Sequence, residues 1–102
     1  MSVMVITKFE APASTMDEMA RGQQRATLER IADIGRSKGA IHHEFAEDVD
    51  GNLLAVDEWE SEDAFHAFFD DMEDIRQVMA AAGVAAPPTT TSYRILATTD
   101  RF

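Results

Sequence analysis

The chain has 102 residues, a formal net charge of −10 and no cysteine. The length predicts one domain over residues 1–102, and a sequence without cysteine excludes disulfides, thiolate metal ligands and a cysteine nucleophile. The segment from Gly39 to Ile75 is rich in Asp and Glu and has no Lys or Arg, which argues against nucleic acid or an anionic membrane as a partner. Because the start is not leader-like and no apolar run reaches about 18 residues, we expect a cytoplasmic protein with a solvated acidic surface.

The first third of the chain predicts a strand followed by a helix. Residues 3–9, VMVITKF, are short and rich in β-branched side chains, as strands are. Thr15, with Glu18 three residues later, has the capping-box pattern that marks a helix start. Apolar residues then recur at helical spacing until Ile34, and Gly35 ends the pattern. We therefore expect one continuous helix over this stretch.

The middle of the chain predicts a hairpin and a second helix. Two strand-like segments, residues 40–48 and 52–60, flank the dipeptide Asp50-Gly51. This dipeptide is a strong signal for a tight two-residue hairpin turn, which requires positive φ. Ser61 follows as a helix cap, and an apolar stripe continues from there toward the proline pair near residue 87.

A last strand at residues 90–99 completes the order β-α-β-β-α-β. This order predicts a ferredoxin-like α+β fold, in which a four-stranded antiparallel sheet carries two helices on one face. The usual strand order of such a sheet puts the first and third strands at its centre. Trp59, the only tryptophan, should therefore come from a central strand.

The third strand has apolar residues on both of its sides. Leu53 and Ala55 alternate with Leu54 and Val56, whereas two helices cover only one face of the predicted sheet. An apolar face without a cover predicts a further partner, and a second copy of the chain is the simplest one. We expect a homodimer formed through the sheet faces.

Residues 39–65, GAIHHEFAEDVDGNLLAVDEWESEDAF, resemble the dimeric α/β-barrel superfamily and, within it, the antibiotic-biosynthesis-monooxygenase-like (ABM-like) domains. The resemblance lies in a glycine after the first helix, an acid-bearing strand, an Asp-rich turn and the ending acid-x-Trp-x-Ser, here Asp57, Trp59 and Ser61. It implies a cavity between sheet and helices in each monomer, with the other sheet face meeting the partner. Some members of this family are cofactor-free oxygenases of aromatic polyketides or quinols, some degrade haem, and many have no established activity.

The haem-degrading branch of that family differs from this chain at two places. It has an asparagine on the first strand, where this chain has Thr7 and its neighbours, and a histidine on the second helix, where this chain has Asp70 and Asp71. The resemblance therefore implies neither haem nor another cofactor. A metal is not expected either, because the neighbouring strand residues His42 and His43 point to opposite faces.

The hairpin register decides which of His42 and His43 shares a face with Trp59. With a two-residue turn, His42 lies opposite Trp59 and Glu44 lies opposite Asp57. We favour this register because it separates apolar from polar residues better. A loop with one more residue would instead bring His43 to the Trp59 face.

The longer loop would also bring Ile41 and Phe45 to the Trp59 face, where they could supply part of a core. In either register, the simpler interpretation of the facing histidine is a hydrogen-bonded strand residue without chemistry. The catalytic interpretation makes it a general acid or base, and the candidate catalytic residues are then His42, His43 and Asp57.

The candidate ligand-binding residues combine aromatic side chains with polar ones. Gln23 and Thr27 lie within the apolar stripe of the first helix, where polar groups without partners favour a cavity. The resemblance implies that Trp59 lines the cavity, and the full candidate set is Trp59, Gln23, Thr27, Phe65, Phe68 and Tyr93. We expect a small apolar or aromatic ligand and two competing functions. One is a cofactor-independent monooxygenase or isomerase, and the other is a non-catalytic ligand-binding or accessory module.

Overall fold

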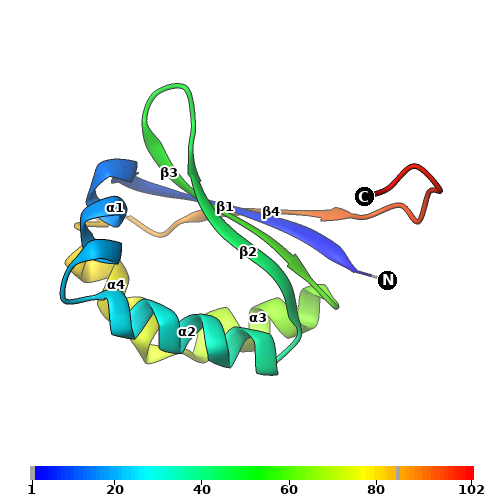
Figure 1. The fold of residues 1–102 in the computed structure, drawn as a ribbon, viewed down its shortest axis with the longest axis horizontal. Helices are drawn as coiled ribbons and strands as arrows, with labels where there is room; N and C mark the ends of the chain where they lie inside the picture. Colours follow the sequence, from blue (N-terminus) through cyan, green and yellow to red (C-terminus); the bar gives the residue numbers. More distant parts are fainter. Residues whose placement is uncertain (1, 85) are drawn as a thin grey trace.

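The computed structural model describes residues 2–84 and 86–102, except the side chain of Asp71. The elements in chain order are β1 (Val3–Pro12), α1 (Ala13–Arg21), α2 (Arg25–Ser37), β2 (Ala40–Glu47), β3 (Asn52–Trp59), α3 (Glu62–Asp71), α4 (Glu73–Ala81) and β4 (Thr89–Arg94). The strands form one antiparallel sheet in the order β2-β3-β1-β4, and the helices lie on one side of it (Figure 1). None of the described helices has both the length and the apolar character that a membrane crossing requires.

The ferredoxin-like arrangement confirms the fold predicted from the sequence, and β1 and β3 are the central strands. Burial along β3 alternates strictly, so that every second side chain faces the helices. Trp59 is among these and is 2% exposed. Its ring contacts Phe65 and Phe68, with centroid distances of 5.8 and 5.0 Å. This aromatic cluster ties the end of the central strand to α3.

Each of the two predicted helices is broken into two. The first breaks at residues 22–24, where the weak helix former Gly22 lies. The second breaks at Met72, whose backbone is extended with φ −91° and ψ 107°. Across this second break, Arg76 Nη2 donates a hydrogen bond to the Asp70 carbonyl at 2.5 Å. The freed carbonyl of α3 is therefore satisfied by a side chain from α4.

The predicted helix starts had different outcomes. Ser61 caps α3 as expected, since its hydroxyl accepts a hydrogen bond from the Ala64 amide at 3.1 Å. The capping box at Thr15 is wrong, because α1 begins at Ala13 directly after Pro12 and has no side-chain cap. Pro12 is the N-cap residue and has an extended backbone, with φ −67° and ψ 140°. The last strand also ends five residues earlier than expected, at Arg94.

The hairpin between β2 and β3 has a three-residue loop, so the favoured two-residue turn is wrong. Asp48 and Asn52 flank the loop, with Asp48 N donating to Asn52 O at 3.1 Å, and Gly51 supplies the positive φ of 81°. The Asp48 carboxylate accepts hydrogen bonds from the amides of Asp50 and Asn52, both at 2.9 Å. These bonds to one side chain hold the longer loop.

The three-residue loop sets which side chains face one another. His43 lies opposite Asp57, and Phe45 lies opposite Ala55. At the other end of β2, a bulge between Ala40 and His42 shifts the register by one residue, so that Ala40 pairs with Trp59. Because a shift of one residue moves every side chain to the other face, His43 rather than His42 is the histidine on the Trp59 face.

The carboxylate of Asp48 in this loop should make the stability of the fold depend on pH. Its pKa is lowered to about 2, chiefly by hydrogen bonds from Asn52 and also by Lys8, whose Nζ lies 3.3 Å away. A lowered pKa in the folded state gives stability that is present above the ordinary value and lost as pH falls through the lowered one. Asp48→Asn should therefore melt at a lower temperature than the parent at pH 7, and the difference should shrink between pH 4 and pH 2. Asp50→Asn, in the same loop, is the matched control. An Asp48 effect independent of pH would contradict this explanation.

Candidate functional site

A cavity of about 440 Å³ lies between the sheet and the helices. This volume is within the range of small-molecule sites, about 300–1,000 Å³. The lining is mostly apolar, and its buried apolar members include Phe9, Ala55, Phe65, Phe68, Ile75 and Val78. On the helix-facing side of the sheet, the polar lining residues include Thr7, His43 and Asp57. A small polar group in an apolar hollow is the usual composition of a ligand site.

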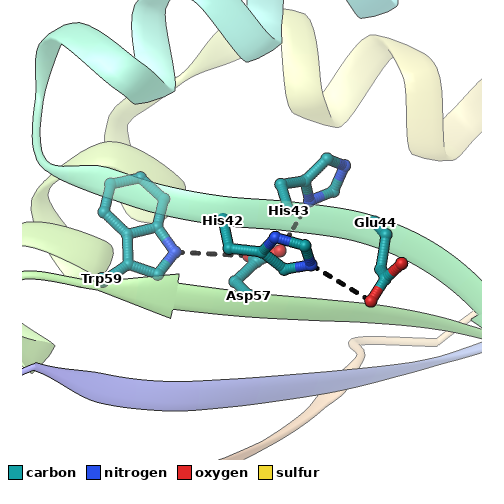
Figure 2. Close-up of polar contacts among 5 residues, drawn as sticks. All are labelled: His42, His43, Glu44, Asp57 and Trp59. Carbon is teal, nitrogen blue, oxygen red and sulfur yellow. Dashed lines mark hydrogen bonds and ion pairs between the residues drawn. The ribbon is translucent and has the colours of Figure 1, made fainter. Parts of the chain in front are cut away.

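Three side chains on the sheet wall form a hydrogen-bonded chain, which Figure 2 shows from His43 through Asp57 to Trp59. His43 Nδ1 lies 2.5 Å from Asp57 Oδ1, and Trp59 Nε1 donates to Asp57 Oδ2 at 3.2 Å. An indole nitrogen only donates, and an ionised carboxylate only accepts. We therefore assign the proton between His43 and Asp57 to Nδ1 of the histidine. Both Asp57 oxygens are then satisfied.

This tautomer leaves the other ring nitrogen of His43, Nε2, with a free lone pair. Figure 2 shows His43 on the helix side of β2, with this nitrogen turned away from Asp57. The side chain of Asp57 is 10% exposed and that of His43 is 39% exposed. The arrangement is a fixed, buried carboxylate that orients an accessible imidazole. Such a pair can accept a proton from a bound molecule and stabilise the resulting imidazolium.

The other two candidates on β2 point to the opposite sheet face. His42 and Glu44 alternate with His43 along the strand, and they are bonded to each other, with His42 Nε2 and Glu44 Oε1 3.1 Å apart (Figure 2). Both side chains are more than half exposed. Both residues border the cavity, because they lie on the edge strand β2, but their bonded side chains lie on the other face. His42 therefore does not join His43 and Asp57.

The candidate ligand-binding residues fall into two groups. Phe65 and Phe68 line the cavity together with Trp59. Gln23, Thr27 and Tyr93 are not among the lining residues. Gln23 is exposed in the turn that breaks the predicted first helix. Tyr93 pairs with Met4 and is 51% exposed on the face away from the helices.

Some lining residues were not identified as ligand candidates from the sequence. Thr7 is 1% exposed on the cavity wall, and its alternation with the buried Val5 and Phe9 could have placed it there. Glu29 and Arg36 line the cavity from α2. Their spacing of seven residues puts them on one side of a helix, but the sequence does not indicate that this side borders a cavity. Within residues 2–84 and 86–102, His, Asp and Glu side chains form no group of three able to hold a metal ion.

No family model matches the sequence, and no curated protein matches it either. Solved structures do share its fold. SnoaB, a cofactor-independent oxygenase from Streptomyces nogalater, is 12% identical with a TM-score of 0.62, and the match covers 98% of each chain. A protein from Bordetella bronchiseptica, provisionally assigned as an antibiotic biosynthesis monooxygenase, is 16% identical with a TM-score of 0.64, over 93% of this chain and 97% of its own.

A third structure, from Deinococcus radiodurans and with the same provisional assignment, is 19% identical with a TM-score of 0.61. The match covers 100% of this chain and 99% of that one. At these identities the likeness shows the fold. The chain therefore has the fold of the ABM-like proteins, as the resemblance in residues 39–65 implied.

Proposed function

We propose that this protein binds a planar, apolar aromatic molecule of the quinol type in its cavity and oxygenates it without a cofactor. The observation that carries the proposal is the His43–Asp57 pair on the wall of a mostly apolar cavity. The shared fold with a cofactor-independent oxygenase supports it. Aromatic side chains such as Phe65 and Phe68 give the cavity walls that suit a flat ring system.

In the proposed reaction, His43 Nε2 removes a proton from a hydroxyl or an acidic C–H group of the bound substrate. Asp57 stabilises the imidazolium that forms, since its carboxylate accepts the Nδ1 proton. The electron-rich substrate anion then reduces molecular oxygen. One oxygen atom replaces two hydrogens of the substrate as a carbonyl and the other leaves with those hydrogens as water, so the substrate itself supplies all four electrons that reduce O2.

A non-catalytic ligand-binding module is the second candidate function. The observation in its favour is that both Asp57 oxygens are bonded to rings of the protein itself, one to His43 and one to Trp59. A buried carboxylate with this many partners is also what a stable hydrogen-bonded wall requires. Both candidate functions predict the same ligand, but only the oxygenase predicts turnover.

The experiment separates binding from turnover with one ligand, 1,4-naphthohydroquinone. Without oxygen, it should quench Trp59 fluorescence saturably, and with oxygen the protein should consume oxygen above the uncatalysed rate. Ala32→Phe narrows the cavity from α2 and should weaken binding at least about tenfold. Ala26→Phe places the same ring on an exposed part of α2 and is the control. Binding without oxygen consumption would favour the binding module, and no binding at all would exclude both candidates.

A further inference from the structure

Thr7 places a polar group among the buried apolar side chains of the central strand β1. Burial alternates along this strand, so that Thr7 faces the helices together with its buried neighbours Val5 and Phe9. The residue is 1% exposed and lines the cavity. Valine would fill such a position on a buried strand without bringing a polar atom. A buried hydroxyl costs stability unless it has a hydrogen-bond partner.

The Thr7 hydroxyl has no hydrogen-bond partner among the residues that the structure describes. In this part of the chain, every side-chain nitrogen or oxygen that is fully enclosed by the protein does have a partner. The unbonded hydroxyl must therefore keep contact with open space, and the cavity is the space that Thr7 lines. It is a group that can both donate and accept a hydrogen bond, and it is directed into the cavity.

The sheet register sets the offset between Thr7 and the His43–Asp57 pair. Asp57 on β3 lies opposite His43 on β2. On its other side it lies opposite Val5, and Thr7 is two residues further along β1. Strands lie about 4.8 Å apart and rise about 3.3 Å per residue, so the backbones of His43 and Thr7 are about 12 Å apart. Ala55, which lies opposite Thr7, has only a methyl group and leaves the wall between the two polar groups low.

We propose that Thr7 is a specificity-determining residue, whose hydroxyl binds a second oxygen of the ligand at the ring edge opposite the one that reaches His43. The inference rests on the proposed function and narrows its substrate class to aromatic molecules with two oxygen substituents in a 1,4 relationship. Such oxygens lie at opposite ends of a ring. With a hydrogen bond of about 2.8 Å at each end, they match the offset between His43 and Thr7 better than neighbouring oxygens do. The hydroxyl can accept a bond from a phenol or donate one to an ether or a carbonyl.

The test uses two ligands of the same shape, 4-methoxy-1-naphthol and 4-ethyl-1-naphthol, of which only the first has an oxygen at the second position. Binding is measured by calorimetry under argon at pH 7. The ratio of the two dissociation constants is compared between variants, so that the difference in hydrophobicity between the ligands cancels. Thr7→Val should shift this ratio by about threefold to tenfold against the methoxy compound, as the loss of one hydrogen bond predicts. Thr7→Ser keeps the hydroxyl and should keep most of the preference of the parent.

Thr90→Val is the matched control and should leave the ratio unchanged, because Thr90 pairs with Thr7 from β4 but is exposed and does not line the cavity. Without ligand, Thr7→Val should melt at the same temperature as the parent or higher, since it removes an unpaired hydroxyl from an apolar wall. A clearly lower melting temperature would mean that the hydroxyl is bonded within the protein. That result, or an unchanged ratio in Thr7→Val, would overturn this inference but leave the proposed ligand site intact. If neither ligand binds the parent, the proposed site is wrong and the inference is wrong with it.

Discussion

Replacement of Asp57 by asparagine should lower the turnover of a quinol by about 10²–10⁴-fold, with ligand affinity changed little. The carboxylate accepts the Nδ1 proton of His43 at 2.5 Å, which keeps Nε2 free to take a proton from the substrate. An amide at this position can turn its NH₂ group toward Nδ1, and the histidine would then carry its proton on Nε2. A misplaced proton removes the base but keeps the shape of the cavity. The measurement is oxygen consumption under saturating 1,4-naphthohydroquinone.

His43→Gln should lower turnover to a similar extent, because it removes the base itself. The histidines on other surfaces provide matched controls. His42 points to the opposite sheet face and His66 is exposed on α3, so His42→Gln and His66→Gln should each change turnover less than about threefold. A large loss with His42→Gln and none with His43→Gln would contradict the observed register as well as the proposed mechanism.

Trp59→Phe tests whether the hydrogen bond to Asp57 positions the pair. The change removes the indole N–H that Asp57 Oδ2 accepts at 3.2 Å, so one oxygen of a buried carboxylate is left without its donor. We expect a loss of about 1–3 kcal/mol in the free energy of unfolding. Turnover by the folded fraction should also fall, but less than with Asp57→Asn, since His43 keeps its partner. A variant that loses stability but not turnover would assign Trp59 to packing alone. Because Trp59 is the only tryptophan, binding by this variant is followed by calorimetry.

The sequence predicted the fold better than the face on which each β2 residue lies. Strand order and the central position of Trp59 follow from element order and hydrophobic period, which are properties of whole segments. Which histidine faces Asp57 depends instead on whether the loop between β2 and β3 has two or three residues. Both registers gave plausible faces, and the choice between them rests on Asp48, whose carboxylate holds the longer loop through the amides of Asp50 and Asn52. A side-chain bond of this kind leaves no periodic signal.

The candidate site was predictable where residues share a strand and not where it depends on helix geometry. Asp57 and Trp59 are two residues apart on β3, so their common face follows from the period of a strand. Gln23 looked like a cavity residue only because one continuous helix was assumed. The break at residues 22–24 moves it into an exposed turn. Arg36 reaches the cavity because α2 lies beside the edge strand β2, and this packing is set by the tertiary structure.

The sheet face away from the helices has an apolar centre. Its side chains alternate with the buried ones, and the apolar members are Met4, Ile6, Ala46, Leu54, Val56 and Tyr93. Met4 and Tyr93 are 39% and 51% exposed. A sheet with one face covered by helices and an apolar second face needs another cover. At the margin, hydrogen bonds from Ser2 and Arg101 lower the pKa of Glu58, which gives the apolar centre a charged rim, as protein interfaces have.

We expect a homodimer in which two such faces pack together, with a mass of twice the 11.3 kDa chain by light scattering at micromolar concentration. Ile6 lies at the centre of the face, with Val56 opposite it on β3 and Thr91 opposite it on β4. Ile6→Lys should give a folded monomer, because the lysine stem can lie along the sheet with its charge in water. In the dimer, by contrast, each copy would bury a charge at a cost of several kcal/mol. That cost should weaken association on the order of 10³-fold or more.

The control for this substitution is Ala67→Lys, which adds the same charge at an exposed position on α3 and should leave the dimer intact. Circular dichroism of Ile6→Lys establishes that a lower mass reflects dissociation of a folded chain. Ligand binding by the monomeric variant is also informative, because the cavity lies between the sheet and the helices of one chain. The affinity for 1,4-naphthohydroquinone should therefore survive dissociation within about threefold. If the parent protein is monomeric at micromolar concentration, the dimer prediction is wrong. The apolar outward face would then need a different partner.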